Sequence, residues 1–141
     1  MVNLMAKWSY SSLSLFKQCP RKYHRLRVVK DIRQEDNTAL IYGKEAHKAA
    51  EDYVCQDTVI PEKFKYIEPY LNILKKLKGD KLCEYEMGLT KDLEPCGFND
   101  TKYWWRGIAD LVVHNNDIAY VVDYKTGKSS RYADVKQLQI L

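Results

Sequence analysis

Two hydrophobic periods divide the chain near Gly79. Before this residue, apolar side chains recur every three or four positions, which is typical of amphipathic helices. After it, runs rich in Val, Ile, Tyr and Trp favour strands. The first pattern predicts helices over about 11–18, 39–54 and 61–79, and the second predicts strands at roughly 81–89, 103–113 and 118–125. A last helix is expected from about Ser130, so the order is helices, then an antiparallel sheet, then a helix.

The last two predicted strands are expected to form a hairpin. Residues 115–117, Asn-Asn-Asp, tolerate the positive φ angles that tight hairpin turns require. Asp110 lies in the otherwise apolar run 107–113 of the first strand, and pairing across the turn would bring it towards Asp123 of the second. Because side chains alternate between the faces of a strand, Asp123 and Lys125 are expected to share one face.

The pair Asp110 and Asp123, with Lys125 beside it, indicates a site for a divalent cation. Two neighbouring carboxylates repel one another, and an oxygen-binding cation such as Mg²⁺ relieves that repulsion. A cation held in this way can orient a phosphate and activate water, while a lysine stabilises charge that develops on the phosphate. The alternative is structural, with an exposed Asp123–Lys125 ion pair and an Asp110 that caps or forms a salt bridge.

Composition is that of an ordinary globular protein. The 141 residues, 45% hydrophobic and 30% charged, suit a single domain. No apolar run approaches the roughly 20 residues that span a bilayer, and residues 1–16 lack the order of a secretory signal. We therefore expect a cytoplasmic protein without a membrane partner.

The four cysteines indicate neither a zinc site nor a disulfide framework. No two of them form a CxxC pair, which a structural zinc site usually needs. Because a secretory signal is missing from the sequence pattern, four reduced thiols are expected.

Positive charge is concentrated in one segment. The net charge of +4 says little, but residues 17–30 contain no acid and six basic residues: Lys17, Arg21, Lys22, Arg25, Arg27 and Lys30. This run could contact phosphate, or it could be a solvated helix end.

Several motifs occur together in one order along the chain. They are Ser9-Tyr10-Ser11-Ser12-Leu13, Cys19-Pro20-Arg21-Lys22-Tyr23, Gly43-Lys44-Glu45-Ala46-His47, Gly107-Ile108-Ala109-Asp110, Val121 to Lys128 (VVDYKTGK) and Gln137-Leu138-Gln139. With this order the chain resembles the RecB-type branch of the PD-(D/E)XK nuclease superfamily over nearly its whole length, including its phage and CRISPR-associated members. The resemblance implies an α/β (α+β) restriction-endonuclease-like core, with N-terminal helices, a mixed or antiparallel sheet and a C-terminal helix.

The resemblance also implies roles for individual residues. The catalytic positions correspond to Asp110, Asp123 and Lys125, and the metal ligands to His47, Asp110, Asp123 and the carbonyl of Tyr124. Gln137 corresponds to the glutamine of a QxxxY motif near the DNA, although Leu141 stands where that motif has tyrosine. The basic residues Arg21 and Lys22 are expected to help to hold DNA.

The implied function is a Mg²⁺-dependent deoxyribonuclease, with Mn²⁺ as a substitute, that acts on DNA in processing, recombination or repair. Exonuclease activity is favoured over endonuclease activity. The alternative is an inactive nucleic-acid-binding or scaffold module with the same fold. Cys19 matches the first cysteine of the iron–sulfur members, but the other three cysteines lie at different positions, so no cluster is expected from these residues.

The domain is expected to be single, with a helical part over 1–80 and a catalytic part over 81–141. The resembled fold continues beyond the helix of Gln137, so its C-terminal part could be missing. Glu51, one turn after His47, could contact that histidine or be a solvated acid. Glu86 could approach the site, but edge-strand solubility is favoured for Glu84 and Glu86. The aromatic run 103–105 could stack on single-stranded bases, but packing is favoured. The compact nuclease core that the resemblance implies suits a bacterial or phage-infected host cell.

Overall fold

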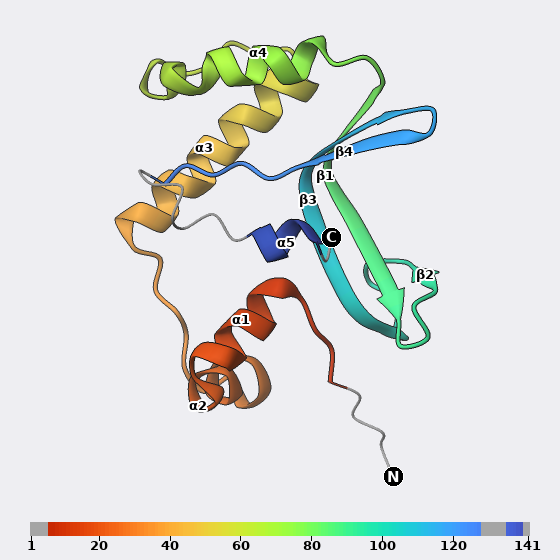
Figure 1. Ribbon diagram of the computed structural model, residues 1–141. Coiled ribbons are helices and arrows are strands. Elements are labelled where there is room, and N and C mark those ends of the chain that lie inside the picture. Colours follow the sequence, from red (N-terminus) through yellow and green to blue (C-terminus); the bar gives the residue numbers. More distant parts are fainter. Residues whose placement is uncertain (1–5, 128–134, 140–141) are drawn as a thin grey trace. The chain divides into compact units, whose positions relative to one another are not determined.

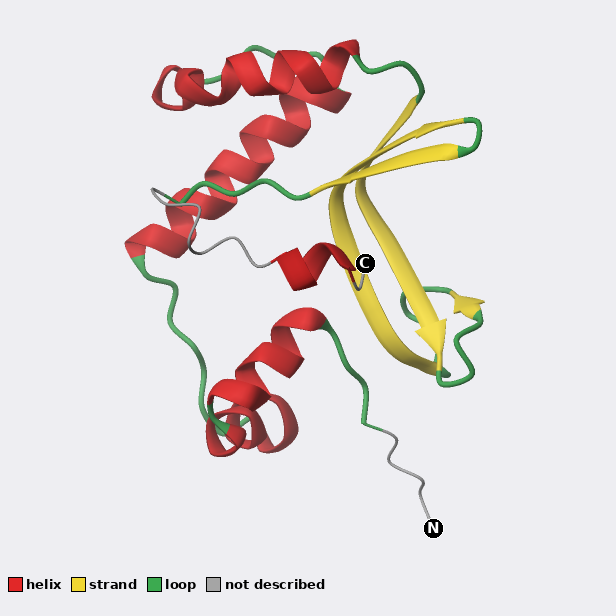
Figure 2. Ribbon diagram, in the orientation of Figure 1, coloured by secondary structure: helices red, strands yellow, loops and turns green. Residues whose placement is uncertain are grey.

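The computed structural model describes residues 6–127 and 135–139 (Figures 1 and 2). Its elements are α1 (Tyr10–Gln18), α2 (Pro20–Tyr23), η1 (His24–Val29), α3 (Thr38–Cys55), η2 (Glu62–Ile67), α4 (Glu68–Lys76), β1 (Asp80–Thr90), β2 (Pro95–Cys96), β3 (Tyr103–Asn115), β4 (Ile118–Val122) and α5 (Val135–Gln139). Two compact units divide them. Unit 1 contains residues up to Glu35 and Glu86–Ile108, and unit 2 contains Asp36–Tyr85 and Ala109–Gln139. Each unit is described by itself.

The strands form one four-stranded sheet in the order β2-β1-β3-β4. The predicted hairpin is confirmed, because β3 and β4 pair antiparallel from Asn115↔Ile118 to Leu111↔Val122. Asn116 in the turn has a φ of 51°, the left-handed conformation that asparagine tolerates. The predicted end of the second strand is wrong. Pairing stops at Val122, so Asp123 and Lys125 lie in the segment that follows the strand.

The core of unit 2 lies between α3, α4 and β3. Small residues of α3 allow close packing, and the predicted helix over 39–54 is confirmed with one more residue at each end. Asn37 caps it, since its Oδ1 accepts a hydrogen bond of 2.8 Å from the Leu40 amide. The buried members of the core are Ala46, Ala49, Ala50, Val54, Ile60, Phe64, Leu71, Leu111 and Val113.

The helix predicted over 61–79 is interrupted and shorter. A 3₁₀ segment, η2, precedes α4, and Pro69 in the first turn of α4 explains the break, because proline donates no hydrogen bond to the preceding turn. The helix ends at Lys76 rather than at Gly79. Gly79 instead has a φ of +126°, and a Cβ there would lie 2.3 Å from the carbonyl oxygen of His114. This glycine is therefore needed where the chain passes close to β3.

Unit 1 carries the basic segment on three short helices. Ser9 and Ser12 form a capping box at the start of α1. Cys19 ends α1 and begins α2, where its Sγ accepts a hydrogen bond of 3.4 Å from the Lys22 amide. The ring of Trp8 stacks on that of Tyr23 with centroids 5.5 Å apart. Phe16 contacts both of these rings edge-on, so the aromatic side chains here pack on one another.

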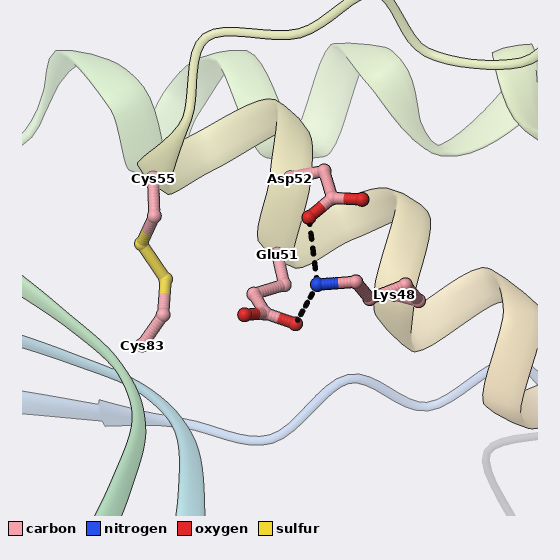
Figure 3. Close-up of a disulfide and its surroundings, with 5 residues drawn as sticks. All are labelled: Lys48, Glu51, Asp52, Cys55 and Cys83. Carbon is pink, nitrogen blue, oxygen red and sulfur yellow. Dashed lines mark hydrogen bonds and ion pairs between the residues drawn. A yellow bond between two sulfur atoms is a disulfide. The ribbon is translucent and has the colours of Figure 1, made fainter.

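The expectation of four reduced thiols is wrong for one pair. A disulfide joins Cys55, the last residue of α3, to Cys83 in β1 (Figure 3). These cysteines are 28 residues apart in sequence, but folding brings their Cα atoms to 6.5 Å, within the range that a disulfide spans. Cys19 and Cys96 are free thiols.

The last predicted helix is represented by α5, while its expected cap, Ser129 or Ser130, and Leu141 lie outside the described residues. Among the described helices, none is long and apolar enough to cross a membrane.

Candidate active site

Asp110 lies directly before the last paired residue of the β3–β4 hairpin. Leu111 of β3 pairs with Val122 of β4. One residue beyond this pair, at the same end of the hairpin, are Asp110 and Asp123. The Asp110 side chain is 14% exposed, and its Oδ2 accepts a hydrogen bond of 2.6 Å from the Tyr124 amide. The hairpin register therefore brings the two aspartates to the same end of the strand pair, as the sequence predicted.

His47 reaches this end of the hairpin from α3. Its neighbours Ala46 and Ala50 are buried, so the helix backbone can approach the sheet closely. The His47 Nδ1 lies 3.4 Å from the Asp110 Oδ2, and the imidazole meets the Tyr124 ring edge-on at 5.8 Å. The hydrogen bond with Asp110 raises the pKa of His47 against the opposing effect of burial. The charges of Asp110 and Asp123 and the Tyr124 backbone raise it further.

Asp123, Lys125 and Gln137 form a second group of contacts. The Lys125 Nζ lies 2.5 Å from the Asp123 Oδ2, and it also donates a hydrogen bond of 2.9 Å to the Gln137 Oε1. The Gln137 Nε2 donates in turn to the Asp123 Oδ1 at 3.0 Å. The Asp123 side chain is 10% exposed, whereas that of Lys125 is 46% exposed. The lysine can therefore reach a ligand in solvent while it stays paired with the acid.

All six residues predicted from the sequence for this site belong to unit 2 and occur in these two groups. We call them the catalytic cluster, after the roles that the family resemblance implies for them: His47, Asp110, Asp123, Tyr124, Lys125 and Gln137. Arg21 and Lys22, the other predicted contacts, lie on α2 in unit 1. The cluster is thus built by one helix face, the end of one hairpin and α5.

Comparison with known protein families agrees with this arrangement. A family model described as the PD-(D/E)XK nuclease superfamily matches residues 7–141. This chain belongs to the PD-(D/E)XK nuclease superfamily. No curated protein and no solved structure matches it. Helices followed by a sheet and a short C-terminal helix are consistent with the restriction-endonuclease-like α/β fold, and the superfamily implies a nucleic acid as substrate.

The catalytic cluster has the donor chemistry that PD-(D/E)XK nucleases need for a divalent metal. Asp110 and Asp123 supply carboxylate oxygens that are largely shielded from water, and Tyr124 supplies a backbone carbonyl near His47. Both carboxylates now bind protein groups. Within residues 6–127 and 135–139, no three His, Cys, Asp or Glu side chains are gathered into a metal site. The donor set fits a hard cation, provided that the carboxylates exchange some of these partners for it.

Glu84 lies near the cluster, which the sequence did not predict. Partial burial raises the pKa of Glu84, and the charges of Asp110 and Glu51 raise it further. Glu84, Glu51 and His47 line one hollow of about 500 Å³ along α3. Lys44 and Lys48 line the same hollow, so its two acids are balanced by two cations. The strand pattern gave no sign that Glu84 would lie there.

Two side chains, Glu51 beside the cluster and Tyr124 within it, have surroundings that the sequence did not predict. Glu51 contacts Lys48, with Oε2 and Nζ 3.1 Å apart, and Lys48 also contacts Asp52 (Figure 3). Glu51 is therefore held by Lys48, and among the described residues it is neither a solvated acid nor a direct partner of His47. The Tyr124 hydroxyl is buried without a hydrogen-bond partner among the described residues, and burial raises the pKa of this phenol, with smaller contributions from nearby carboxylates.

Proposed function

We propose that this protein is a metal-dependent DNA nuclease of the RecB type that acts as an exonuclease in DNA processing. The observation that carries the proposal is the convergence of two shielded aspartates, a histidine and a lysine at one end of the β3–β4 hairpin. These residues belong to three different parts of the sequence. Such a set has no obvious use in a protein that only needs to fold, because burying like charges together is unfavourable.

Asp110, Asp123, the Tyr124 carbonyl and His47 would hold the metal ion. Mg²⁺, or Mn²⁺ in its place, would supply positive charge that neutralises the phosphate and makes a water molecule more acidic. Asp110 is oriented for this role by the Tyr124 amide, and His47 is oriented by Asp110. A neutral imidazole is needed to bind a metal, so protonation of His47 at low pH would compete with the ion.

Lys125 would act on the phosphodiester itself. In the reaction, the oxygen of a water forms a bond to phosphorus, the P–O bond to one DNA oxygen breaks, and a proton reaches the leaving oxygen. Negative charge accumulates on the non-bridging oxygens in the transition state, and an ammonium group at hydrogen-bond distance stabilises it. The exposed Nζ of Lys125, anchored by Asp123, suits this task.

Unit 1 would contribute to DNA binding through its basic segment. Arg21 and Lys22 are exposed on α2. A hollow of about 570 Å³ beside η1 is lined by Leu26, Arg27, Lys30, Ile32, Arg33 and Gln34. Three of these six residues are cations, which favours the phosphate backbone as a ligand over any neutral molecule.

Cleavage assays test the proposal. Linear duplex, closed circular duplex and single-stranded DNA would be incubated with the wild-type protein and with the Asp123→Ala and Lys125→Ala variants, with and without Mg²⁺. We expect degradation of linear DNA only with Mg²⁺, survival of circular duplex, and loss of activity in both variants. Cleavage that persists in either variant would rule out the assignment, and cutting of circular duplex would exclude a strict exonuclease.

An inactive nucleic-acid-binding module is the alternative. One observation favours it: the carboxylates of Asp110 and Asp123 are both bound by protein groups. DNA binding that is independent of metal, without cleavage under any divalent ion, would be the result expected for such a module.

A further inference from the structure

Gln137 lies between the two residues that the proposed reaction uses most directly. Its side-chain amide donates to the Asp123 Oδ1 at 3.0 Å and accepts from the Lys125 Nζ at 2.9 Å. Asp123 and Lys125 also contact each other at 2.5 Å. The three side chains therefore form a closed triangle of contacts, in which the amide is the neutral member.

The amide group is suited to both contacts at once. It offers an acceptor oxygen to the ammonium and a donor nitrogen to the carboxylate, which neither a carboxylate nor an ammonium at this position could do. A lysine side chain that is half exposed loses considerable conformational freedom when it is held in one place. A second partner for Lys125 fixes its Nζ relative to Asp123 in a way that one exposed ion pair does not.

We propose that Gln137 is a positioning residue, which sets the place of the Lys125 ammonium relative to the Asp123 carboxylate, and that it acts through these residues rather than as a DNA contact. This inference rests on the proposed nuclease function. It differs from the role that the family resemblance implies, because each polar end of the amide already contacts a protein group of the proposed site. Each end keeps one further hydrogen-bonding position, so kinetics, and not these contacts alone, separate the positioning role from a DNA contact.

Each role gives a different kinetic result when the amide is replaced. Gln137→Met keeps the length of the side chain and removes both hydrogen bonds. Gln139→Met is the matched control, because Gln139 is an exposed glutamine on the same helix. Misplacing a reacting group by about 1 Å can cost as much as a hundredfold in rate. We therefore expect kcat to fall roughly tenfold to a hundredfold in Gln137→Met with KM unchanged, and no change in the control.

A second readout does not depend on catalysis. The rate at which an amine-acetylating reagent modifies Lys125 would be measured by mass spectrometry in the absence of metal and DNA. We expect faster modification of Lys125 in Gln137→Met than in the wild type, with the modification rate of Lys76 unchanged. Thermal unfolding of both variants checks that the fold is retained.

The outcomes separate the inference from the function on which it rests. A lower kcat at constant KM with faster modification of Lys125 supports the positioning role. A higher KM at constant kcat overturns it and makes Gln137 a DNA contact, and unchanged modification of Lys125 also overturns it. If the wild-type protein cleaves no DNA, the nuclease proposal fails, and the modification rate alone then decides whether Gln137 holds Lys125.

Discussion

The catalytic cluster in unit 2 and the basic segment in unit 1 differ in how their charged side chains are paired. In the cluster, His47 faces Asp110 and Lys125 faces Asp123, and the two carboxylate side chains are only 14% and 10% exposed. In the basic segment, Arg25 pairs with Asp31. Within the part of the chain that the structure describes, Arg27 and Lys30 have no acidic partner, and neither has Arg33, which follows the segment and lines the same hollow. Partnered charges have fixed positions, whereas unpartnered surface charges are mobile and hydrated.

This difference indicates a division of labour. Groups with fixed positions can stabilise a transition state, because they need little reorganisation when charge develops. Hydrated surface cations contribute to affinity instead, because they release counterions from the DNA and so make binding dependent on salt. We therefore expect changes in the cluster to alter kcat, and changes in the basic segment to alter affinity.

Among the changes that test this division of labour, Lys125→Met has the largest expected effect. Removal of one charge-stabilising donor typically lowers a rate by about 10²–10³-fold, and we expect a decrease of this size in kcat. DNA affinity, measured with Ca²⁺ in place of Mg²⁺, should stay within about twofold of the wild type, because Lys125 is one of 23 lysine and arginine residues in the chain. Lys76→Met on α4 is the control with the same change in charge. A large decrease in DNA affinity of Lys125→Met without a decrease in kcat would make Lys125 a binding residue. It would contradict the proposed division between the catalytic cluster and the basic segment.

Removal of the Cys55–Cys83 disulfide should destabilise the unit that contains the cluster. A cross-link over a loop of this length stabilises a fold by about 3.6 kcal/mol in the chain-entropy account. We expect Cys55→Ser/Cys83→Ser to lower the melting temperature and to speed amide hydrogen exchange in residues 36–85, but not in residues 6–35. Cys19→Ser, which changes a free thiol, is the control. Equal acceleration in both ranges would mean that the units do not unfold separately.

Neutralising the three cations that line the hollow beside η1 should weaken binding and leave chemistry intact. For Arg27→Gln/Lys30→Gln/Arg33→Gln we expect a shallower dependence of affinity on salt, by about 0.9 for each phosphate that the variant no longer neutralises, with kcat unchanged. Fluorescence anisotropy at several salt concentrations would measure this slope. Lys76→Gln/Lys78→Gln/Lys91→Gln controls for net charge, because it removes three charges from exposed lysines elsewhere. Arg21→Gln/Lys22→Gln tests the two DNA-binding residues predicted from the sequence. An unchanged slope in the triple variant would show that its hollow does not bind DNA.

The smallest expected effect is a dependence of stability on pH. The contact with Asp110 raises the pKa of His47, so the folded state binds this proton more tightly than the unfolded state does. The resulting stabilisation is fully present below the unfolded pKa of about 6.5 and is lost as pH rises through the folded value.

Thermal unfolding of the metal-free protein between about pH 5 and pH 9 measures the stabilisation that comes from His47. His47→Gln should remove this component, and Asp110→Asn should reduce it in the same pH range. A component that persists in His47→Gln would have to come from another group.

The main elements of the fold were predictable because they depend on local patterns. The spacing of small and apolar residues on α3 and the Asn-rich turn before β4 were sufficient to predict a helix and a hairpin. The proximity of Asp110 and Asp123 follows from that hairpin. The positions of His47 and Gln137 came from the resemblance to a family, since no local pattern brings a helix to the end of a hairpin.

The predictions that were wrong concern features that depend on contacts between residues distant in sequence. Cys55 and Cys83 meet only after α3 and β1 have packed in unit 2. Gly79 looked like a helix terminator, but it is required by a close approach to His114. The strand was expected to include Asp123, yet pairing stops at Val122, and the Asp110 side chain then accepts the Tyr124 amide hydrogen. In each case a tertiary contact decided the local structure.

The central claim is that the Asp110 and Asp123 pair holds a metal ion that is needed to cut DNA. The most direct measurement is the rate of degradation of linear duplex DNA as a function of Mg²⁺ concentration, for the wild type and for Asp110→Asn. Asparagine keeps the shape of the side chain and removes its charge. We predict saturable, Mg²⁺-dependent degradation by the wild type and none by Asp110→Asn at any Mg²⁺ concentration. Degradation by Asp110→Asn at the wild-type rate, or degradation by the wild type without a divalent metal, would contradict the claim.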